Sequence, residues 1–247
     1  MKSSSSVKKF FSLLHEPGAS SLLLMVVIAD FLFVALHLLL FKTTLLSNPL
    51  LNIEMDKGYA ELFQYLKYLW IILLLSSVCL KEKAVCYVPW VVLFAYFLLD
   101  DALGLHESAG YQIGTFLSFT PPFGLRPDDI GEFLVSVSAG LIILPLIVVA
   151  YLRSTRAFRK FSHDLILLVM VLVFFGVAVD MVHMALHDHA TIAFYLGVLE
   201  DGGEMLSLSL ILWYAFLVLM RTQKARVYLS DLISMPFSTR ASAHVSA

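Results

Sequence analysis

The sequence is poor in charged residues. Only 15% of its 247 residues are Asp, Glu, Lys or Arg, whereas 60% are hydrophobic. Soluble domains carry about 25% charged and about 45–50% apolar residues. This composition excludes an ordinary soluble domain, and a net charge of −2 leaves no excess of basic residues to bind nucleic acid. We therefore expect a membrane protein whose main partner is the lipid bilayer.

Cysteine is also scarce, and internal repeats and long linkers are absent. The two cysteines, Cys79 and Cys86, lie on either side of a short segment that contains Lys81 and Lys83. Two thiols next to a predicted cytoplasmic turn provide neither a disulfide framework nor a thiolate metal site. Any metal site in this chain must therefore use His, Asp and Glu.

Six segments are apolar over about the 20 residues that a helix needs to cross a bilayer. They span residues 20–41, 59–80, 85–104, 130–152, 164–186 and 194–220. The sequence thus predicts an all-α fold, a polytopic bundle of six transmembrane helices over residues 20–221. We expect residues 1–19 to form a cytoplasmic segment with a short amphipathic helix at 7–14, and residues 222–247 to form a cytoplasmic tail.

Basic residues are distributed unequally between the two ends of these spans. Thirteen of the seventeen Lys and Arg lie in the N-terminal segment, the tail and the connections after the second and fourth spans. Because cytoplasmic loops are enriched in Lys and Arg, both termini are predicted to be cytoplasmic. This is the orientation of a multi-pass protein of the cell inner membrane with both ends inside.

Acidic residues have the opposite distribution. Only four of the nineteen acids, Glu16, Glu82, Asp164 and Asp231, fall on the predicted cytoplasmic side. Of the others, Asp100 and Asp180 lie on spans whose outer end is a helix C-terminus, where the helix dipole disfavours a negative charge. These two acids therefore need a partner, a proton or a metal ion near the extracytoplasmic face.

The fifth predicted span carries two histidines beside one of these acids. At 100° per residue, Asp180, His183 and His187 fall within roughly 60° of one another on a helix. Ionisable groups inside a membrane are costly and are functional-site candidates. Neutral imidazole with carboxylate suits zinc or iron, so this stripe predicts a divalent metal site.

Residues on other spans can join this site at a similar depth. We predict that the metal ligands are Asp100, His106, Asp180, His183, His187 and Glu200. His106 meets Asp100 only if Gly104 ends the helix and lets the chain curl back. Glu204 and Glu107 are the candidate general bases. Lys67 is expected to neutralise Glu61 or Asp101.

Two metal arrangements fit these residues. Asp180-x-x-His183 matches the spacing of one half of a di-iron bundle, with Glu200 and Glu204 as possible bridging acids, but a second Glu-x-x-His is absent. A single zinc ion with an open position for water needs fewer assumptions.

Asp180, His183 and His187 also resemble the zinc site of the superfamily of alkaline ceramidases and adiponectin-type receptors. Members of that superfamily bind zinc through a few His and an Asp near one membrane face, with a His-x-x-x-His in a late helix. The resemblance covers about five residues. This chain has six predicted spans rather than seven, and its histidine pair lies on the fifth span. The run of Asp100, Asp101, His106 and Glu107 also departs from the pattern of that superfamily, so the resemblance implies only a zinc site near one membrane face.

Three classes of function follow from the sequence. The first is a metal-dependent membrane enzyme, a hydrolase or di-iron oxidase, acting on a lipid-like or small substrate. The second is a cation or proton transporter, although residues 165–179 carry no charge and only Asp30 lies near mid-depth. The third is a non-catalytic sensor or envelope assembly protein in which the acids form a polar core.

Overall fold

The computed structural model describes residues 16–116, 121–122 and 125–221. The predicted amphipathic helix at 7–14 and residues 222–247 of the tail lie outside this part of the chain. The described residues are helical and contain no strand. The helices are α2 (Pro17–Lys42), η1 (Pro49–Leu51), α3 (Tyr59–Glu82), η2 (Val85–Tyr87), α4 (Val88–Leu103), α5 (Leu105–Phe116), α6 (Pro127–Arg153), α7 (Arg156–Val173), η3 (Phe174–Val179), α8 (Asp180–Ala185) and α9 (Ala190–Met220).

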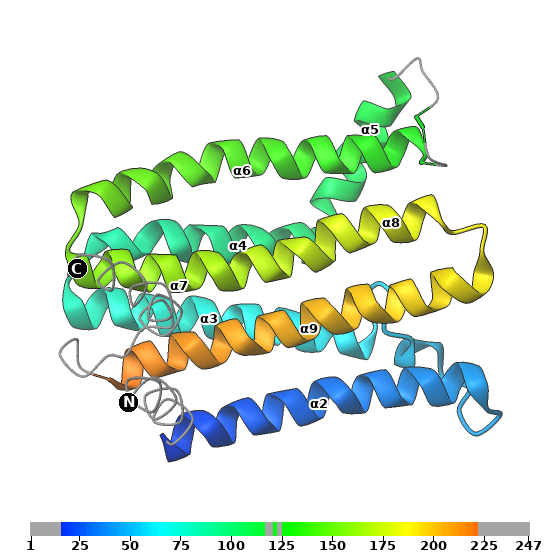
Figure 1. Ribbon diagram of the computed structural model, residues 1–247, viewed down its shortest axis with the longest axis horizontal. Helices are drawn as coiled ribbons and strands as arrows, with labels where there is room; N and C mark the ends of the chain where they lie inside the picture. Colours follow the sequence, from blue (N-terminus) through cyan, green and yellow to red (C-terminus); the bar gives the residue numbers. More distant parts are fainter. Residues whose placement is uncertain (1–15, 117–120, 123–124, 222–247) are drawn as a thin grey trace, which may run out of the picture.

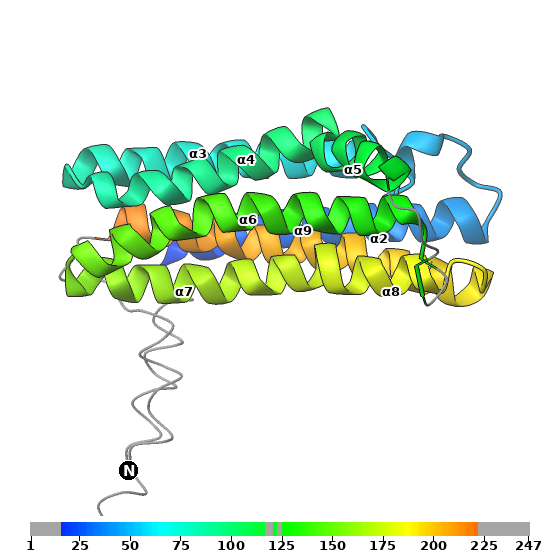
Figure 2. The same cartoon turned by 90° about the horizontal axis from the view of Figure 1, so that it is seen from above.

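Six stretches are long and apolar enough to cross a membrane, as the sequence predicts. Figures 1 and 2 show them running side by side along the long axis of the molecule. α9 lies in the middle, where it contacts α2, α3 and α7. In the most apolar 18-residue stretch of α9, 67% of the residues are buried. The corresponding stretch has 11% of its residues buried in Pro127–Arg153 and 17% in Gly18–Lys42. α9 is therefore the central helix, and α2 and α6 are peripheral.

The outward faces of the peripheral helices are apolar. On α2, for example, the large side chains of Leu24, Met25 and Phe31 are all more than half exposed. Inside the bundle, Ile71 and Leu75 of α3 pack with Leu208 and Ile211 of α9 in a continuous apolar core. A protein that is apolar both inside and outside is suited to a lipid environment.

The two ends of the described chain lie at the same end of the bundle. Arg221 Nη2, just after α9, lies 3.0 Å from Glu16 Oε1, just before α2. The α3–α4 and α6–α7 turns are also at this end (Figure 1), which we call the terminal end. The opposite end carries α5, α8 and the α2–α3 loop, and we call it the α5 end. The compartment that each end faces stays a prediction.

Candidate functional site

A turn at Gly104 brings His106 back toward Asp100 at the α5 end. Gly104 follows the last residue of α4 in a left-handed conformation (φ +59°), and its N–H donates to the carbonyls of Asp100 and Asp101. Glycine tolerates this conformation because it has no Cβ. The chain then enters α5, and the backbone N–H of His106 donates to Asp100 Oδ1 at 3.0 Å. Gly104 thus ends the helix and lets the chain curl back. This is the condition under which the sequence predicts a contact between His106 and Asp100.

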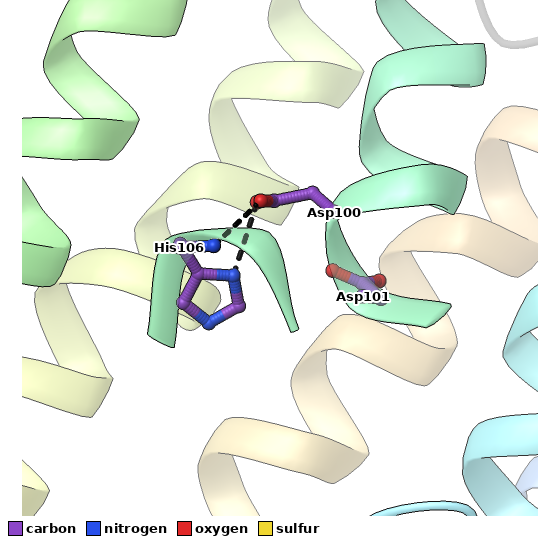
Figure 3. A group of neighbouring side chains, drawn as sticks. All are labelled: Asp100, Asp101 and His106. Carbon is purple, nitrogen blue, oxygen red and sulfur yellow. Dashed lines mark hydrogen bonds and ion pairs between the residues drawn. The ribbon is translucent and has the colours of Figure 1, made fainter. Parts of the chain in front are cut away.

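Within the described residues, one group of acids and histidines has ligand atoms close enough together to hold a single metal ion. It consists of Asp100, Asp101 and His106, with one ligand atom from each within 4.8 Å of the others. In Figure 3 the Asp100 side chain points toward the His106 ring, and Asp101 is the next residue of α4. The donors are two carboxylates and one imidazole, which suit zinc, iron or manganese.

The imidazole of His106 has a nitrogen that a metal ion could use. Nδ1 lies 3.1 Å from Asp100 Oδ2. This nitrogen is buried, and no hydrogen bond of suitable geometry reaches it. Buried polar atoms are normally hydrogen-bonded, so an exception calls for an explanation. A cation between His106 and Asp100 would satisfy both groups, and the residues present therefore fit a metal ion.

Asp100 also controls the charge of His106, which lies on α5, outside the six candidate spans. The interaction with Asp100 raises the pKa of His106 to about 9, and the charges of Glu107 and Asp101 act in the same direction while burial opposes them. The ring is therefore protonated at neutral pH when no cation is bound. A metal ion must displace this proton to bind the nitrogen.

Close backbone contact holds α5 against the start of α6. A Cβ on Gly110 of α5 would lie 2.6 Å from the backbone nitrogen of Glu132, and one on Gly131 of α6 would overlap the Gly110 carbonyl. The first turn of α6 is closed by Asp129, whose carboxylate accepts from the Arg126 backbone at 2.7 Å and from its guanidinium at 2.8 Å. These contacts pack α5, the helix that carries His106, closely against α6.

Tyrosine hydroxyls connect α3 to the Asp100–Asp101 segment. The hydroxyl of Tyr65 lies 3.1 Å from the main-chain oxygen of Asp101 and also contacts the carboxylate of Glu61. That carboxylate accepts from the backbone N–H of Lys57 in the α2–α3 loop. The hydroxyl of Tyr68 interacts with the Asp101 carboxyl group. The α2–α3 loop, α3 and α4 are thus joined beside Asp101.

A second group of acids surrounds His183 on α8. His183 Nδ1 lies 2.7 Å from Glu200 Oε2 on α9, and the Glu200 carboxyl group interacts with that of Asp180. Glu54 of the α2–α3 loop reaches the same place, because a Cβ on Gly197 would lie 2.7 Å from its Cδ and 3.2 Å from His183 Cε1. The imidazole therefore lies among carboxylates from α8, α9 and the loop.

Between α7 and α8 the chain forms a π-helix, η3, rather than the regular helix expected over 164–186. π-Helical turns are rare and often occur at functional sites. Here a Cβ on Gly176 would overlap the carboxylate of Glu204, and one on Gly203 would overlap the ring of Phe175. The two glycines therefore allow η3 and α9 to approach closely. The Glu204 carboxylate occupies the space that a side chain at position 176 would need.

Glu204 of α9 is within electrostatic range of both groups. Its carboxylate interacts electrostatically with Asp101 and His106 on one side and with Glu200 and Asp180 on the other. The α5 end therefore contains one layer of acids and imidazoles drawn from the α2–α3 loop, α4, α5, α8 and α9. Of the eight predicted site residues, this layer brings together six: Asp100, His106, Asp180, His183, Glu200 and Glu204.

The structure leaves His187 outside this layer and Glu107 at its exposed edge, from where its charge still acts on His106. α8 ends at Ala185, so the helical spacing from Asp180 to His187 is lost. The His187 ring is half exposed, with Nε2 3.2 Å from Asp188 and Nδ1 2.8 Å from the Met184 carbonyl. Glu107 is exposed on the first turn of α5, where its carboxylate lies beside Gly104.

Lys67 does not neutralise Glu61 or Asp101 as expected, and that prediction is wrong. Its ammonium group is fully buried between α2, α3 and α9 and lies 2.8 Å from Asp30. Glu61 is instead held by Tyr65 and Lys57. The error arises because a helical position gives the face of a side chain but not the neighbour that this face meets.

Two residues of the layer were not among the predicted ligands. Asp101 directly follows Asp100, and the sequence signal for it is this adjacent pair just before a glycine. Glu54 lies in a loop, where helical spacing carries no information about the direction of a side chain. Only the folding of residues 43–58 over Gly197 brings Glu54 to His183.

Comparison with known families adds one finding. The family model described as "Domain of unknown function (DUF8692)" matches residues 19–220. The chain belongs to this family. The DUF8692 match runs from the first turn of α2 to the end of α9, so it contains all six candidate spans and both groups of acids and histidines. No curated protein and no solved structure matches the chain.

Proposed function

We propose that this protein is a metal-dependent membrane enzyme, a hydrolase whose cation is held by Asp100, Asp101 and His106. The observation that supports this proposal is that one ligand atom from each residue lies within 4.8 Å of the others, with the buried Nδ1 of His106 facing Asp100 Oδ2 at 3.1 Å. Zinc or iron suits this donor set. Three protein ligands leave a coordination position open for water or substrate.

A bound divalent cation would acidify a water molecule and polarise a substrate carbonyl. Glu204 is proposed as the general base because its carboxyl group is within electrostatic range of Asp101 and His106, and a cation bound there would favour its ionised form. In hydrolysis, the water oxygen forms a bond to the acyl carbon and the bond to the leaving oxygen or nitrogen breaks. Glu204 takes the proton from the water and returns it to the leaving group.

Asp180, His183 and Glu200 have one of two roles in this proposal. A carboxylate that holds Nδ1 of an imidazole fixes the tautomer and leaves Nε2 available for proton transfer or for a metal ion. In the hydrolase these residues transfer protons beside the cation. In the di-iron oxidase that the sequence also allows, they would hold a second ion. The number of metal ions per chain distinguishes the two.

The position of the site supports a lipid-like substrate. The layer of acids lies at the α5 end, directly beyond the apolar core that α3 shares with α9, in a bundle with apolar outer faces. A substrate with an acyl chain and a polar group would place the polar group at this level. With the predicted orientation, the α5 end faces the extracytoplasmic side.

Metal analysis of the purified full-length protein tests the proposal. We expect one zinc or iron per chain by mass spectrometry, and binding of Mn²⁺ to the metal-free protein by isothermal calorimetry and electron paramagnetic resonance. Asp101→Asn and His106→Ala should each weaken Mn²⁺ binding at least tenfold. Asp56→Asn removes the same charge from the exposed α2–α3 loop and should change affinity less than threefold.

Two results would overturn this assignment. If the wild-type protein binds neither zinc, iron nor Mn²⁺ stoichiometrically, no metal enzyme is present, and the acids form a polar core of a sensor or assembly protein. If proteoliposomes instead conduct cations or protons, and Asp30→Asn abolishes this flux, transport replaces hydrolysis as the function.

A further inference from the structure

A second polar group lies deeper in the bundle and takes no part in the proposed reaction. Lys67, in the middle of α3, is fully buried, as is Asp30 of α2. The Lys67 ammonium donates to Asp30 Oδ1 at 2.8 Å, to the Met205 carbonyl at 2.9 Å and to Ser209 Oγ at 3.3 Å. The Ser209 hydroxyl in turn donates to the second Asp30 oxygen at 2.5 Å.

This group is a closed network. The three N–H donors of the ammonium group have three acceptors, and each oxygen of the carboxylate has a donor. Ionisable groups in a membrane interior are costly, and the loss of one partner leaves the other buried without compensation. One turn closer to the terminal end, Ile71 of α3 and Leu212 of α9 are buried apolar residues. The contacts therefore indicate a junction between helices rather than a step in a polar path across the bundle.

The junction is connected to the site at two points. Met205, whose carbonyl binds Lys67, directly follows Glu204 of the acidic layer. Tyr68, which directly follows Lys67, interacts with the Asp101 carboxyl group. Lys67 thus fixes the position of α9 along α3 within one residue of Glu204, and α3 in turn contacts Asp101.

We propose that the Asp30–Lys67 ion pair positions α9 against α3 and α4, and so sets the place of Glu204 relative to Asp100, Asp101 and His106. Lys67 acts as a positioning residue through the Met205 carbonyl and does not touch the metal. Asp30 holds the ammonium group between the helices through this ion pair. This inference rests on the proposed metal site for its functional consequence, but the helix placement that it describes can be measured without metal.

The first test measures Mn²⁺ affinity in the full-length protein by calorimetry. Lys67→Met should weaken binding about tenfold or more, the range found for residues that support metal ligands. Asp30→Asn combined with Lys67→Gln leaves two neutral amides that can still hydrogen-bond, and it should restore affinity to within threefold of the wild-type protein.

Two control variants separate positioning from general stability. Lys81 also donates to an α9 carbonyl, that of Leu219 at 2.8 Å, but at the exposed terminal end. Lys81→Met should therefore leave Mn²⁺ affinity unchanged. Leu75 is a fully buried apolar residue of α3. Leu75→Ala should lower the melting temperature while Mn²⁺ affinity stays within threefold, because the helices near the site keep their places.

A second test needs no metal. With Cys79 and Cys86 replaced by Ser, spin labels at the exposed positions Leu103 of α4 and Tyr195 of α9 report the distance between these helices. The wild-type pair should give a narrow distance distribution, and Lys67→Met should broaden or shift it. If the wild-type protein binds no Mn²⁺, the metal site fails and this distribution alone decides the inference. An unchanged distribution in a folded Lys67→Met protein overturns it, as does unchanged affinity.

Discussion

His183 Nδ1 and Glu200 Oε2 lie 2.7 Å apart and join α8 to α9 at the level of the acidic layer. A hydrogen bond between an imidazole nitrogen and a carboxylate directs the other ring nitrogen toward a reaction partner or a metal ion. The same relationship, with poorer geometry, links His106 to Asp100. Both histidines of the layer are therefore oriented by an acid from a neighbouring helix or turn.

The number of bound ions decides between a mononuclear and a dinuclear centre. We expect that Glu200→Gln leaves one metal ion per chain, because the ligands Asp100, Asp101 and His106 remain. Inductively coupled plasma mass spectrometry of the purified variant measures this number. A fall from two ions in the wild-type protein to one in the variant would instead identify the His183 group as a second metal site.

Metal affinity should depend on pH through His106. Since the interaction with Asp100 raises the pKa of His106 to about 9, protons compete with the cation below that pH. We expect Mn²⁺ affinity to rise about tenfold per pH unit between about pH 7 and pH 9 and then to level off. Calorimetry across this range measures the slope, and His106→Ala should remove most of it. A wild-type affinity that is flat below pH 9 would contradict this prediction.

The same pKa predicts the pH dependence of stability in the metal-free protein. A raised pKa in the folded state means that the ion pair with Asp100 contributes fully below the ordinary histidine value of 6.5. That contribution is lost as pH rises through about 9. The melting temperature of the metal-free wild-type protein should therefore fall across this interval more than that of His106→Ala.

Gly104 should not tolerate a side chain. Alanine at φ +59° costs about 1–2 kcal/mol in the left-handed conformation, and its Cβ would lie 3.3 Å from Glu107 Oε2. Gly104→Ala should therefore lower the free energy of unfolding by about this amount and weaken Mn²⁺ binding, because His106 depends on this turn. Denaturation in detergent and calorimetry measure the two effects. Normal stability with normal affinity would show that the turn does not position His106.

Gly176 and Gly140 provide a matched pair of substitutions. A Cβ on Gly176 would overlap the carboxylate of Glu204, whereas one on Gly140 of α6 would meet no atom within 4 Å. Gly176→Ala should destabilise the protein by about 1–3 kcal/mol, as expected for overpacking. Gly140→Ala should be neutral or stabilise α6 by up to about 1 kcal/mol. Equal melting temperatures for the two variants would argue against the close contact between η3 and α9.

The helical architecture could be predicted because apolar run length is a direct physical requirement of a bilayer. The six predicted segments correspond to the six candidate spans, with differences mainly at their ends. Helical periodicity also placed Asp180 and His183 on one face. It failed at His187, because α8 stops at Ala185 and the periodicity applies only within a continuous helix.

The contacts between helices could not be read in the same way. The sequence shows that Asp30 and Lys67 are isolated charges in two spans, but not that these spans are adjacent. The π-helix η3 carries no charge or proline that would mark it, and it forms where Gly176 and Gly203 allow close packing with α9. The role of Gly104 could be stated only as a condition, since a glycine permits a left-handed turn without requiring one.

The central place of α9 has a consequence for biosynthesis. Among the described spans, the one around which the others pack is the last to leave the ribosome. Until it enters the bilayer, Lys67 lacks the Met205 carbonyl and the Ser209 hydroxyl, and the surfaces of α2, α3 and α7 that α9 covers face lipid or each other. Packing of the described spans is therefore completed by α9, and a nascent chain arrested before residue 190 would expose the surfaces that α9 covers.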